Sequence, residues 1–226
     1  MREIVLDTET TGLDPASGHR IVEVGCIELI NHVASNRPGG TFHHYLNPER
    51  SMPAEAEAVH GLKDDFLADK PLFADIADAF LEFIGDAPLV IHNAEFDMRF
   101  LNSELTRLGH PPLPSSRAVD TLAMARRRYP GAQASLDALC RRYDIDNAGR
   151  TLHGALLDSS LLAEVYLELI GGRQPDLTLA ADRAGGTAGA AATRAPRPAR
   201  PHAPTPEEAK AHELFLEKIK EPIWTA

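Results

Sequence analysis

The chain has very few cysteines and no long apolar run, and both scarcities restrict the class of protein. Its 226 residues include two cysteines, and each lies inside an apolar pattern. We therefore expect Cys26 and Cys140 to be thiols buried in the core rather than the two halves of a disulfide or ligands of a metal ion. No apolar stretch approaches the roughly 18 residues that a membrane-spanning helix needs, and the first residues do not resemble a signal peptide. We expect a cytoplasmic protein that makes no membrane contact.

Positive charge is also scarce. The chain carries 23 Lys and Arg against 33 Asp and Glu, which gives a net charge of −10. This excess argues against a protein that holds nucleic acid by neutralising phosphates alone. If nucleic acid is the substrate, we expect weak, salt-sensitive binding in which bound metal ions supply much of the positive charge.

The apolar pattern predicts an α/β fold with a mixed sheet. Three strands, at 3–8, 21–30 and 41–46, should form a meander of antiparallel hairpins. A fourth strand, at 88–92, should be covered on both faces. Helices are expected over 53–60, 71–84, 95–108, 118–128, 135–143 and 154–170. The segment 118–128 should begin with a short strand. Asn93 and Ser135 should act as N-caps. The buried stripe of the 95–108 helix should be Phe96, Phe100, Leu101, Leu105 and Leu108.

Composition changes at Gly171, which predicts an appendage after a folded domain of residues 1–172. Residues 173–206 should form a flexible linker, because most of them lack apolar periodicity. Residues 207–226 should form a docking segment, with a short amphipathic helix that begins near Thr205 and exposes Leu214, Phe215 and Trp224. This helix could instead fold back onto the domain, but so long a tether favours docking.

Asp7-Thr8-Glu9-Thr10-Thr11-Gly12 directly follows the apolar residues Ile4-Val5-Leu6, so it lies at the end of a buried strand. Successive strand side chains point to opposite faces, and Asp7 and Glu9 therefore project the same way. Two like charges on a core strand are unfavourable unless a cation lies between them. Carboxylate oxygens suit hard divalent cations. Alone, the pair also fits a strand that ends in an acidic turn.

Three further residues could complete a metal site. Asp97 lies one turn into a predicted helix, where the helix dipole favours a carboxylate, although an acid there also fits helix capping. Asp158 interrupts the apolar face of the last helix of the domain, and His153 lies at the entry to that helix. Taken alone, His153 fits an N-terminal capping residue.

Together these positions resemble the DEDD superfamily of 3′→5′ exonucleases, and the spacing His153-x4-Asp158 marks its histidine subclass, DEDDh. Asp7-x-Glu9 resembles the first motif, Asn93-x3-Asp97 the second and His153-x4-Asp158 the third. Further runs resemble the epsilon-type proofreading family of bacterial DNA polymerase III, at 59–61, 119–125, 135–140 and 153–166. The resemblance covers about residues 3–172 and implies an RNase H-like mixed sheet flanked by helices.

The resemblance implies phosphodiester hydrolysis with two metal ions and release of nucleoside 5′-monophosphates. Asp7 would bridge two Mg²⁺ or Mn²⁺ ions roughly 4 Å apart. Glu9 and Asp158 would complete the coordination of one ion, and Asp97 that of the other. Neutral His153 would accept the proton of the attacking water, since an imidazole titrates near pH ~6.5.

The resemblance also implies contacts with the terminal nucleotide at the DNA 3′ end. Asp7, Glu9 and Asp158 would take part together with Glu55 and His60. Glu57 is an alternative to Glu55, because the sequence around them is repetitive. His60 could instead be a core histidine whose hydrogen bonds are made within the fold.

Beyond the domain, Gln174-Pro175-Asp176-Leu177-Thr178-Leu179 resembles the sliding-clamp motif of replication proteins, with Gln174, Leu177 and Leu179 as contacts. The resemblance implies that the tail binds the DNA polymerase III alpha subunit, with the beta sliding clamp and a small accessory subunit as further partners. The implied activity is proofreading of DNA. One alternative is an exonuclease that trims the 3′ ends of RNA. Another is an inactive subunit that only bridges polymerase and clamp, which is disfavoured because all five catalytic positions carry residues able to perform the chemistry.

Overall fold

The structure, a computed structural model, describes residues 1–35, 37–150, 152–172 and 204–219. The chain divides into two units, Met1–Leu177 and Thr178–Ala226. Among the described residues, no helix is both long enough and apolar enough to cross a membrane.

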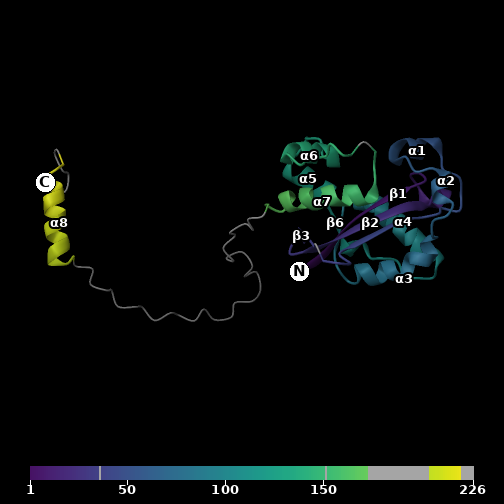
Figure 1. Cartoon of the computed structure of the whole chain (residues 1–226), viewed down its shortest axis with the longest axis horizontal. Helices are drawn as coiled ribbons and strands as arrows, with labels where there is room; N and C mark the ends of the chain where they lie inside the picture. The colour runs from purple at the N-terminus through teal and green to yellow at the C-terminus, as the bar shows by residue number, and fades with distance from the viewer. Residues whose placement is uncertain (36, 151, 173–203, 220–226) are drawn as a thin grey trace. The chain divides into compact units, whose positions relative to one another are not determined.

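The described part of the first unit is built on a mixed sheet of six strands (Figure 1). β1 (Arg2–Thr10) pairs antiparallel with β2 (Ile21–Ile30), and β2 pairs antiparallel with both β3 (Val33–Ala34) and β4 (Thr41–Tyr45). β5 (Leu89–Ile91) lies parallel to β1, and β6 (Ala118–Asp120) lies parallel to β5. The predicted mixed sheet and its antiparallel meander are confirmed.

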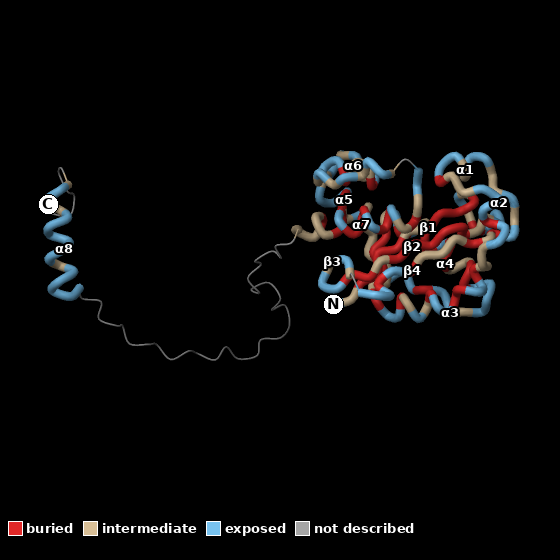
Figure 2. Tube along the Cα trace, in the orientation of Figure 1, coloured by how far each residue is buried: buried red, intermediate tan, exposed pale blue. Residues whose placement is uncertain are grey.

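Helices cover both faces of this sheet, and the central strands are the most buried part of the unit (Figures 1 and 2). α3 (Phe73–Ile84) and α4 (Ala94–Arg107) share a core with Ile4 and Leu6. α5 (Thr121–Arg128), α6 (Leu136–Tyr143) and α7 (Ala155–Leu169) share another with Val5 on the opposite face. The remaining helical segments are short: η1 (Pro15–Ser17), α1 (Ala54–His60), α2 (Asp64–Leu67) and η2 (Ser115–Arg117).

The alternation along β1 decides which way its acidic residues point. Ile4 and Leu6 face α3 and α4, whereas Val5 faces α7. Because side chains alternate along a strand, Asp7 and Glu9 continue the row of Val5 toward α7.

A glycine on β2 allows α7 to approach the sheet at the same point. Gly25 is the partner of Asp7 in the β1–β2 ladder, and a Cβ atom at Gly25 would lie 2.4 Å from backbone atoms of Ala155 and Leu156. The Ser159 hydroxyl donates to the Gly25 carbonyl at 2.9 Å. The absence of a side chain therefore brings the first turn of α7 against β2, beside Asp7.

The predicted elements of the first unit are present, with small shifts at their ends, but several details of the prediction are wrong. Asn93 occupies the N-cap position of α4 as predicted, but its side chain makes no capping hydrogen bond; it has a left-handed φ of 66°, and its backbone N–H donates to Asp120 at 3.2 Å. Leu108 is 41% exposed, and Phe96 is only partly buried. Ser135 caps α6 as predicted, and both cysteines are buried free thiols.

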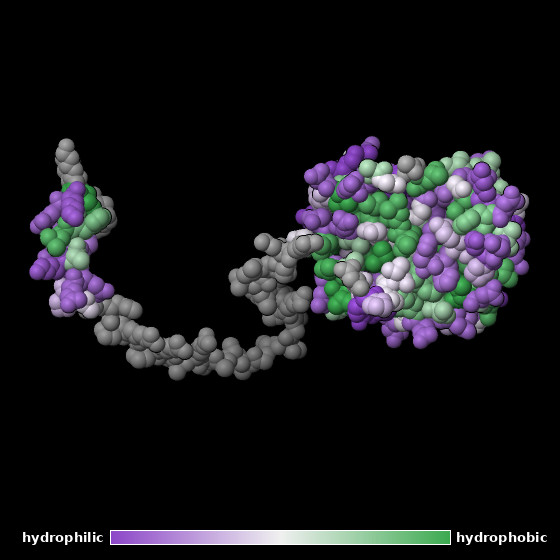
Figure 3. All heavy atoms as spheres, viewed as in Figure 1, coloured by the Kyte–Doolittle hydropathy of each residue, from purple (hydrophilic) through white to green (hydrophobic). Residues whose placement is uncertain are grey.

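In the second unit, the described residues form α8 (Pro206–Leu216). The helix begins after Thr205, as the sequence predicts, and Thr205 and Glu208 cap it reciprocally. Leu214 is 53% and Phe215 58% exposed, and hydrophobic and hydrophilic side chains share the surface of this helix (Figure 3). Gln174, Leu177, Leu179 and Trp224 lie outside the described residues, and the domain boundaries stay predictions.

Candidate active site

One cleft of about 590 Å³ at the carboxyl end of β1 collects the predicted catalytic residues. They come from β1, from the first turn of α4, and from the start of α7 with the loop before it, as Asp7, Glu9, Asp97, His153 and Asp158. Residues separated by about 150 positions in the chain thus line a single cleft.

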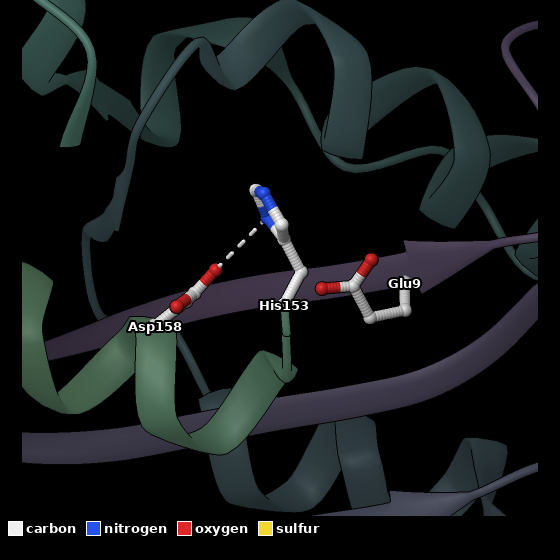
Figure 4. A group of neighbouring side chains, drawn as sticks. All are labelled: Glu9, His153 and Asp158. Atoms are coloured by element: carbon white, nitrogen blue, oxygen red, sulfur yellow. Dashed lines mark ion pairs between the residues drawn. The ribbon is translucent and has the colours of Figure 1, made fainter. Parts of the chain in front are cut away.

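Glu9, His153 and Asp158 lie close together in the cleft (Figure 4). Each offers one ligand atom, and these atoms all lie within 4.8 Å of one another. His153 Nδ1 is 3.4 Å from Asp158 Oδ2. The His153 side chain is 48% exposed whereas that of Asp158 is 4% exposed, so the histidine lies at the mouth of the cleft and the carboxylate in its wall.

Asp97 is fixed to the end of β1 by Thr8. The Thr8 backbone N–H and hydroxyl both donate to Asp97 Oδ1, at 3.1 and 2.7 Å. Burial raises the pKa of Asp97 to about 7, although the Thr8 hydrogen bonds oppose that shift. The expectation that the helix dipole stabilises this carboxylate is therefore outweighed by burial.

Asp7 and Glu9 lie in an environment that disfavours their charged forms. Burial, and then the charges of Asp97, Glu9 and Asp158, hold the pKa of Asp7 well above its usual value. Burial, and then the charge of Asp158, raises the pKa of Glu9 to about 8. Repulsion among buried carboxylates is the situation that a bound cation relieves.

Asp158 differs because it already has a cationic partner, Arg150. The Arg150 guanidinium donates to both carboxylate oxygens, from Nε at 2.5 Å and from Nη2 at 2.7 Å. Burial acts to raise the pKa of Asp158, but that pKa is held below its usual value, chiefly by the hydrogen bonds from Arg150.

This donor set fits a divalent cation. Mg²⁺ and Mn²⁺ prefer carboxylate oxygens as ligands. The three clustered ligand atoms, together with the raised pKa values of Asp7, Glu9 and Asp97, indicate a site whose charge is compensated by metal.

A second hollow of about 620 Å³ adjoins the cleft and shares Thr8, Glu9 and Phe96 with it. Glu55 and His60 line this hollow, and Glu57 does not belong to its lining. His60 is buried, its Nδ1 accepts from the Leu62 N–H at 3.1 Å, and burial lowers its pKa. The position favours Glu55 over Glu57, and the nucleotide contacts stay a prediction.

Several residues that line or support the cleft were not predicted as site residues from the sequence. Arg150 and Asp137 form an ion pair at 2.8 Å beside Asp158, and Thr8 positions Asp97. His92 and Arg126 also line the cleft. One signal was available for Arg150, because it is the one Arg or Lys between Tyr143 and Asp158, three residues before His153.

Comparison with known families defines the class of protein. Residues 4–166 match the exonuclease family known as RNase_T. This match includes all five residues predicted at the cleft, and the chain belongs to this family.

Within the family, the relatives are replication proteins. DNA polymerase III subunit epsilon of Rickettsia felis is 59% identical over 177 residues, which cover 77% of this chain and 76% of the relative. The same subunit of Escherichia coli is 49% identical over 180 residues, which cover 76% of this chain and 72% of the relative. The chain is therefore an exonuclease of the epsilon-subunit type.

Solved structures agree on the fold. Exonuclease X in complex with 5′ overhanging duplex DNA superposes with a TM-score of 0.57 at 26% identity and covers 74% of this chain and 90% of its own. The nuclease domain of 3′hExo, a DEDDh family member bound to rAMP, superposes with a TM-score of 0.64 at 19% identity, covering 75% and 91%. The expected exonuclease fold is confirmed.

Proposed function

We propose that this chain removes mispaired 3′-terminal nucleotides from newly made DNA, as the proofreading 3′→5′ exonuclease of a replicative polymerase. The cleft at the end of β1 carries this proposal, since it brings four carboxylates and one exposed histidine together. The identity with epsilon subunits supports DNA as the substrate over RNA.

The cleft carboxylates, Asp7, Glu9, Asp97 and Asp158, would hold two Mg²⁺ or Mn²⁺ ions. When bound, the ions would polarise the scissile phosphodiester and offset the charge that develops during hydrolysis. Thr8 contributes by orienting Asp97 through two hydrogen bonds to one oxygen, which leaves Oδ2 available as a ligand.

His153 would accept the proton of the attacking water. It is half-exposed at the mouth of the cleft, where solvent can reach it, and its backbone N–H is fixed to the Val59 carbonyl at 3.1 Å. A proton acceptor must be neutral before the reaction, and an imidazole is a common general base.

The adjoining hollow would receive the terminal nucleotide. Its walls combine apolar groups such as Val59 and Phe96 with the hydroxyl-bearing turn Thr10-Thr11-Gly12. An apolar wall suits a base, and polar groups suit a sugar and its 3′-hydroxyl. Because the hollow shares Glu9 with the catalytic cleft, a nucleotide bound there would place its phosphodiester beside the metal ligands.

The tail would keep this acidic enzyme on DNA by binding other replication proteins. We propose that α8 and the residues after it bind the polymerase alpha subunit, and that Gln174, Leu177 and Leu179 bind the beta sliding clamp. A small accessory subunit is a further candidate partner. Tethering raises the effective concentration of the nuclease at the primer end, so little intrinsic DNA affinity is needed.

A nuclease assay on the purified full-length chain tests the function. We expect Mg²⁺- or Mn²⁺-dependent release of mononucleotides from the 3′ end of single-stranded DNA, faster cleavage of mispaired than of paired primer ends, and slower cleavage of RNA. EDTA should abolish all cleavage. Faster cleavage of RNA would support the RNA-trimming alternative, and a folded chain without nuclease activity would support a purely bridging subunit.

A further inference from the structure

Arg150 is a nearly buried cation at the edge of the catalytic cleft. Its side chain is 7% exposed. It lies in the loop between α6 and α7, three residues before His153. Besides the paired bonds to Asp158, Nη1 donates to Asp137 Oδ1 at 2.8 Å, and Nη2 donates to His153 Nδ1 at 2.8 Å. One guanidinium thus joins three groups of the cleft wall.

Nη2 is the atom that matters for metal binding. It lies 2.7 Å from Asp158 Oδ2 and 2.8 Å from His153 Nδ1, which belong to two of the three side chains that cluster as candidate ligands. A positive group therefore already fills the space between two of the groups that would ligate an ion. It also uses lone pairs that a cation would need.

The same contact constrains His153. A guanidinium can only donate hydrogen bonds, so the ring nitrogen of His153 that binds Nη2, at 2.8 Å for Nδ1 and 3.5 Å for Nε2, accepts and carries no proton. While this contact lasts, the lone pair of that ring nitrogen is not available to a proton from water. With Arg150 in this position, the pair Asp158–His153 is in a resting arrangement.

We propose that Arg150 is an internal counter-ion of the cleft that competes with the divalent ion for Asp158 and must withdraw from Asp158 and His153 for catalysis. This inference rests on the metal site of the proposed function. A divalent ion beside Asp158 would be repelled by the guanidinium at short range, and ion binding would release both the carboxylate and the histidine from it. Arg150 would act through these residues, as a positioning residue.

Binding of Mn²⁺ to the full-length chain without DNA, followed by calorimetry, tests this competition. Arg150→Gln should bind Mn²⁺ roughly tenfold more tightly than wild type, because one nearby positive charge is removed. Arg150→Lys, which keeps the charge but loses the paired geometry, should fall between the two. Arg141→Gln removes the same charge from the exposed surface of α6 and should leave Mn²⁺ affinity unchanged.

A purely structural role for Arg150 predicts the opposite sign. If Arg150 only holds Asp158 and His153 in place, Arg150→Gln should bind Mn²⁺ more weakly, and that result, or an unchanged affinity, would overturn the inference. A wild-type chain that binds no Mn²⁺ would instead contradict the metal site of the proposed function, and the inference would fail with it.

If Arg150→Gln does not fold, the wild-type chain still provides a test. The hydrogen-bonded Nε–H of Arg150 should give a separate ¹H–¹⁵N resonance, and titration with Mg²⁺ should shift it or remove it as Arg150 leaves Asp158. A resonance that stays unchanged at saturating Mg²⁺ would overturn the inference.

Discussion

The fold stabilises the charged form of one carboxylate in the cleft and disfavours the charged forms of others. Arg150 stabilises the charged form of Asp158, whereas burial and mutual repulsion disfavour the charged forms of Asp7 and Glu9. We therefore expect the carboxylates on β1 and α4 to need a bound metal ion to balance their charge, and this need should be visible in the effect of pH.

The free energy of unfolding of the metal-free chain should fall as pH rises. The pKa of Glu9 increases from 4.5 to about 8 on folding, so between these values the folded state binds more protons than the unfolded state. A raised carboxyl pKa therefore makes folding less favourable as pH increases through this window.

Thermal unfolding in EDTA from about pH 5 to about pH 8 measures this effect. Glu9→Gln has no ionisable group at that position and should lose less stability over the range than wild type. Mn²⁺ competes with protons for the carboxylates, so its stabilising effect should increase with pH. Equal pH dependence in the two chains would contradict the raised pKa of Glu9.

His153→Gln should separate turnover from metal binding. Loss of the proton acceptor should lower kcat by roughly 100-fold or more, while Mn²⁺ affinity should change much less because the carboxylates remain. Steady-state hydrolysis of single-stranded DNA and a Mn²⁺ titration measure the two effects. His110→Gln, a change outside the cleft, is the control, and an unchanged kcat in His153→Gln would mean that another group accepts the proton.

At the scale of elements, the site depends on how closely α7 approaches the sheet at Gly25. A Cβ atom there would lie 2.4 Å from backbone atoms of α7, and backbone cannot rotate away as a flexible side chain can. Gly25→Ala should therefore push the start of α7, with Asp158, away from Asp7.

We expect Gly25→Ala to lower the free energy of unfolding by about 1–3 kcal/mol and to reduce nuclease turnover. Gly149→Ala is the matched control, because a Cβ atom at Gly149 would have no heavy atom within 4 Å. Chemical denaturation and the DNA assay measure both effects. Wild-type stability and turnover in Gly25→Ala would show that α7 does not need this close approach.

Elements with strong periodicity could be predicted from the sequence, and elements defined by tertiary contacts could not. The patterns along β1 and α7 showed Asp7, Glu9 and Asp158 as charges within apolar runs, and the resemblance to the exonuclease motifs made them candidate site residues. β3 has two residues and α2 has four, too few to show a period.

The same limit applies to the side chains that support the site. Arg150 meets Asp137 and Asp158 only after the loop between α6 and α7 has folded. Thr8 contacts Asp97 across 89 positions of the chain. Asn93 carries the residue type of an N-cap, but its left-handed backbone prevents side-chain capping. These features depend on three-dimensional geometry that residue type does not specify.

At the scale of the whole molecule, the proposed function combines an acidic nuclease with a tail that binds partners. The net charge of −10 gives little attraction to DNA, and exposed Leu214 and Phe215 give α8 an apolar surface for docking. Catalysis and recruitment should therefore be separable by mutation.

Replacing both Leu214 and Phe215 by Ala should weaken binding to the polymerase alpha subunit by roughly tenfold or more, because buried aromatic and aliphatic anchors dominate such interfaces. Turnover on free single-stranded DNA should stay at the wild-type level. Lys210→Ala is the control on the same helix. Surface plasmon resonance and the DNA assay measure the two properties, and undiminished polymerase binding would exclude α8 as the docking element.

The most direct test of the central claim is the rate at which Asp7→Ala hydrolyses a mispaired primer end in Mg²⁺. Asp7 is the carboxylate assigned to both ions, so its loss should lower turnover by roughly a thousandfold or more. Thermal unfolding in EDTA should show an intact fold, and Asp69→Ala, an exposed carboxylate outside the cleft, should keep full activity. A folded Asp7→Ala chain that retains wild-type turnover would contradict the assignment of this cleft as the active site.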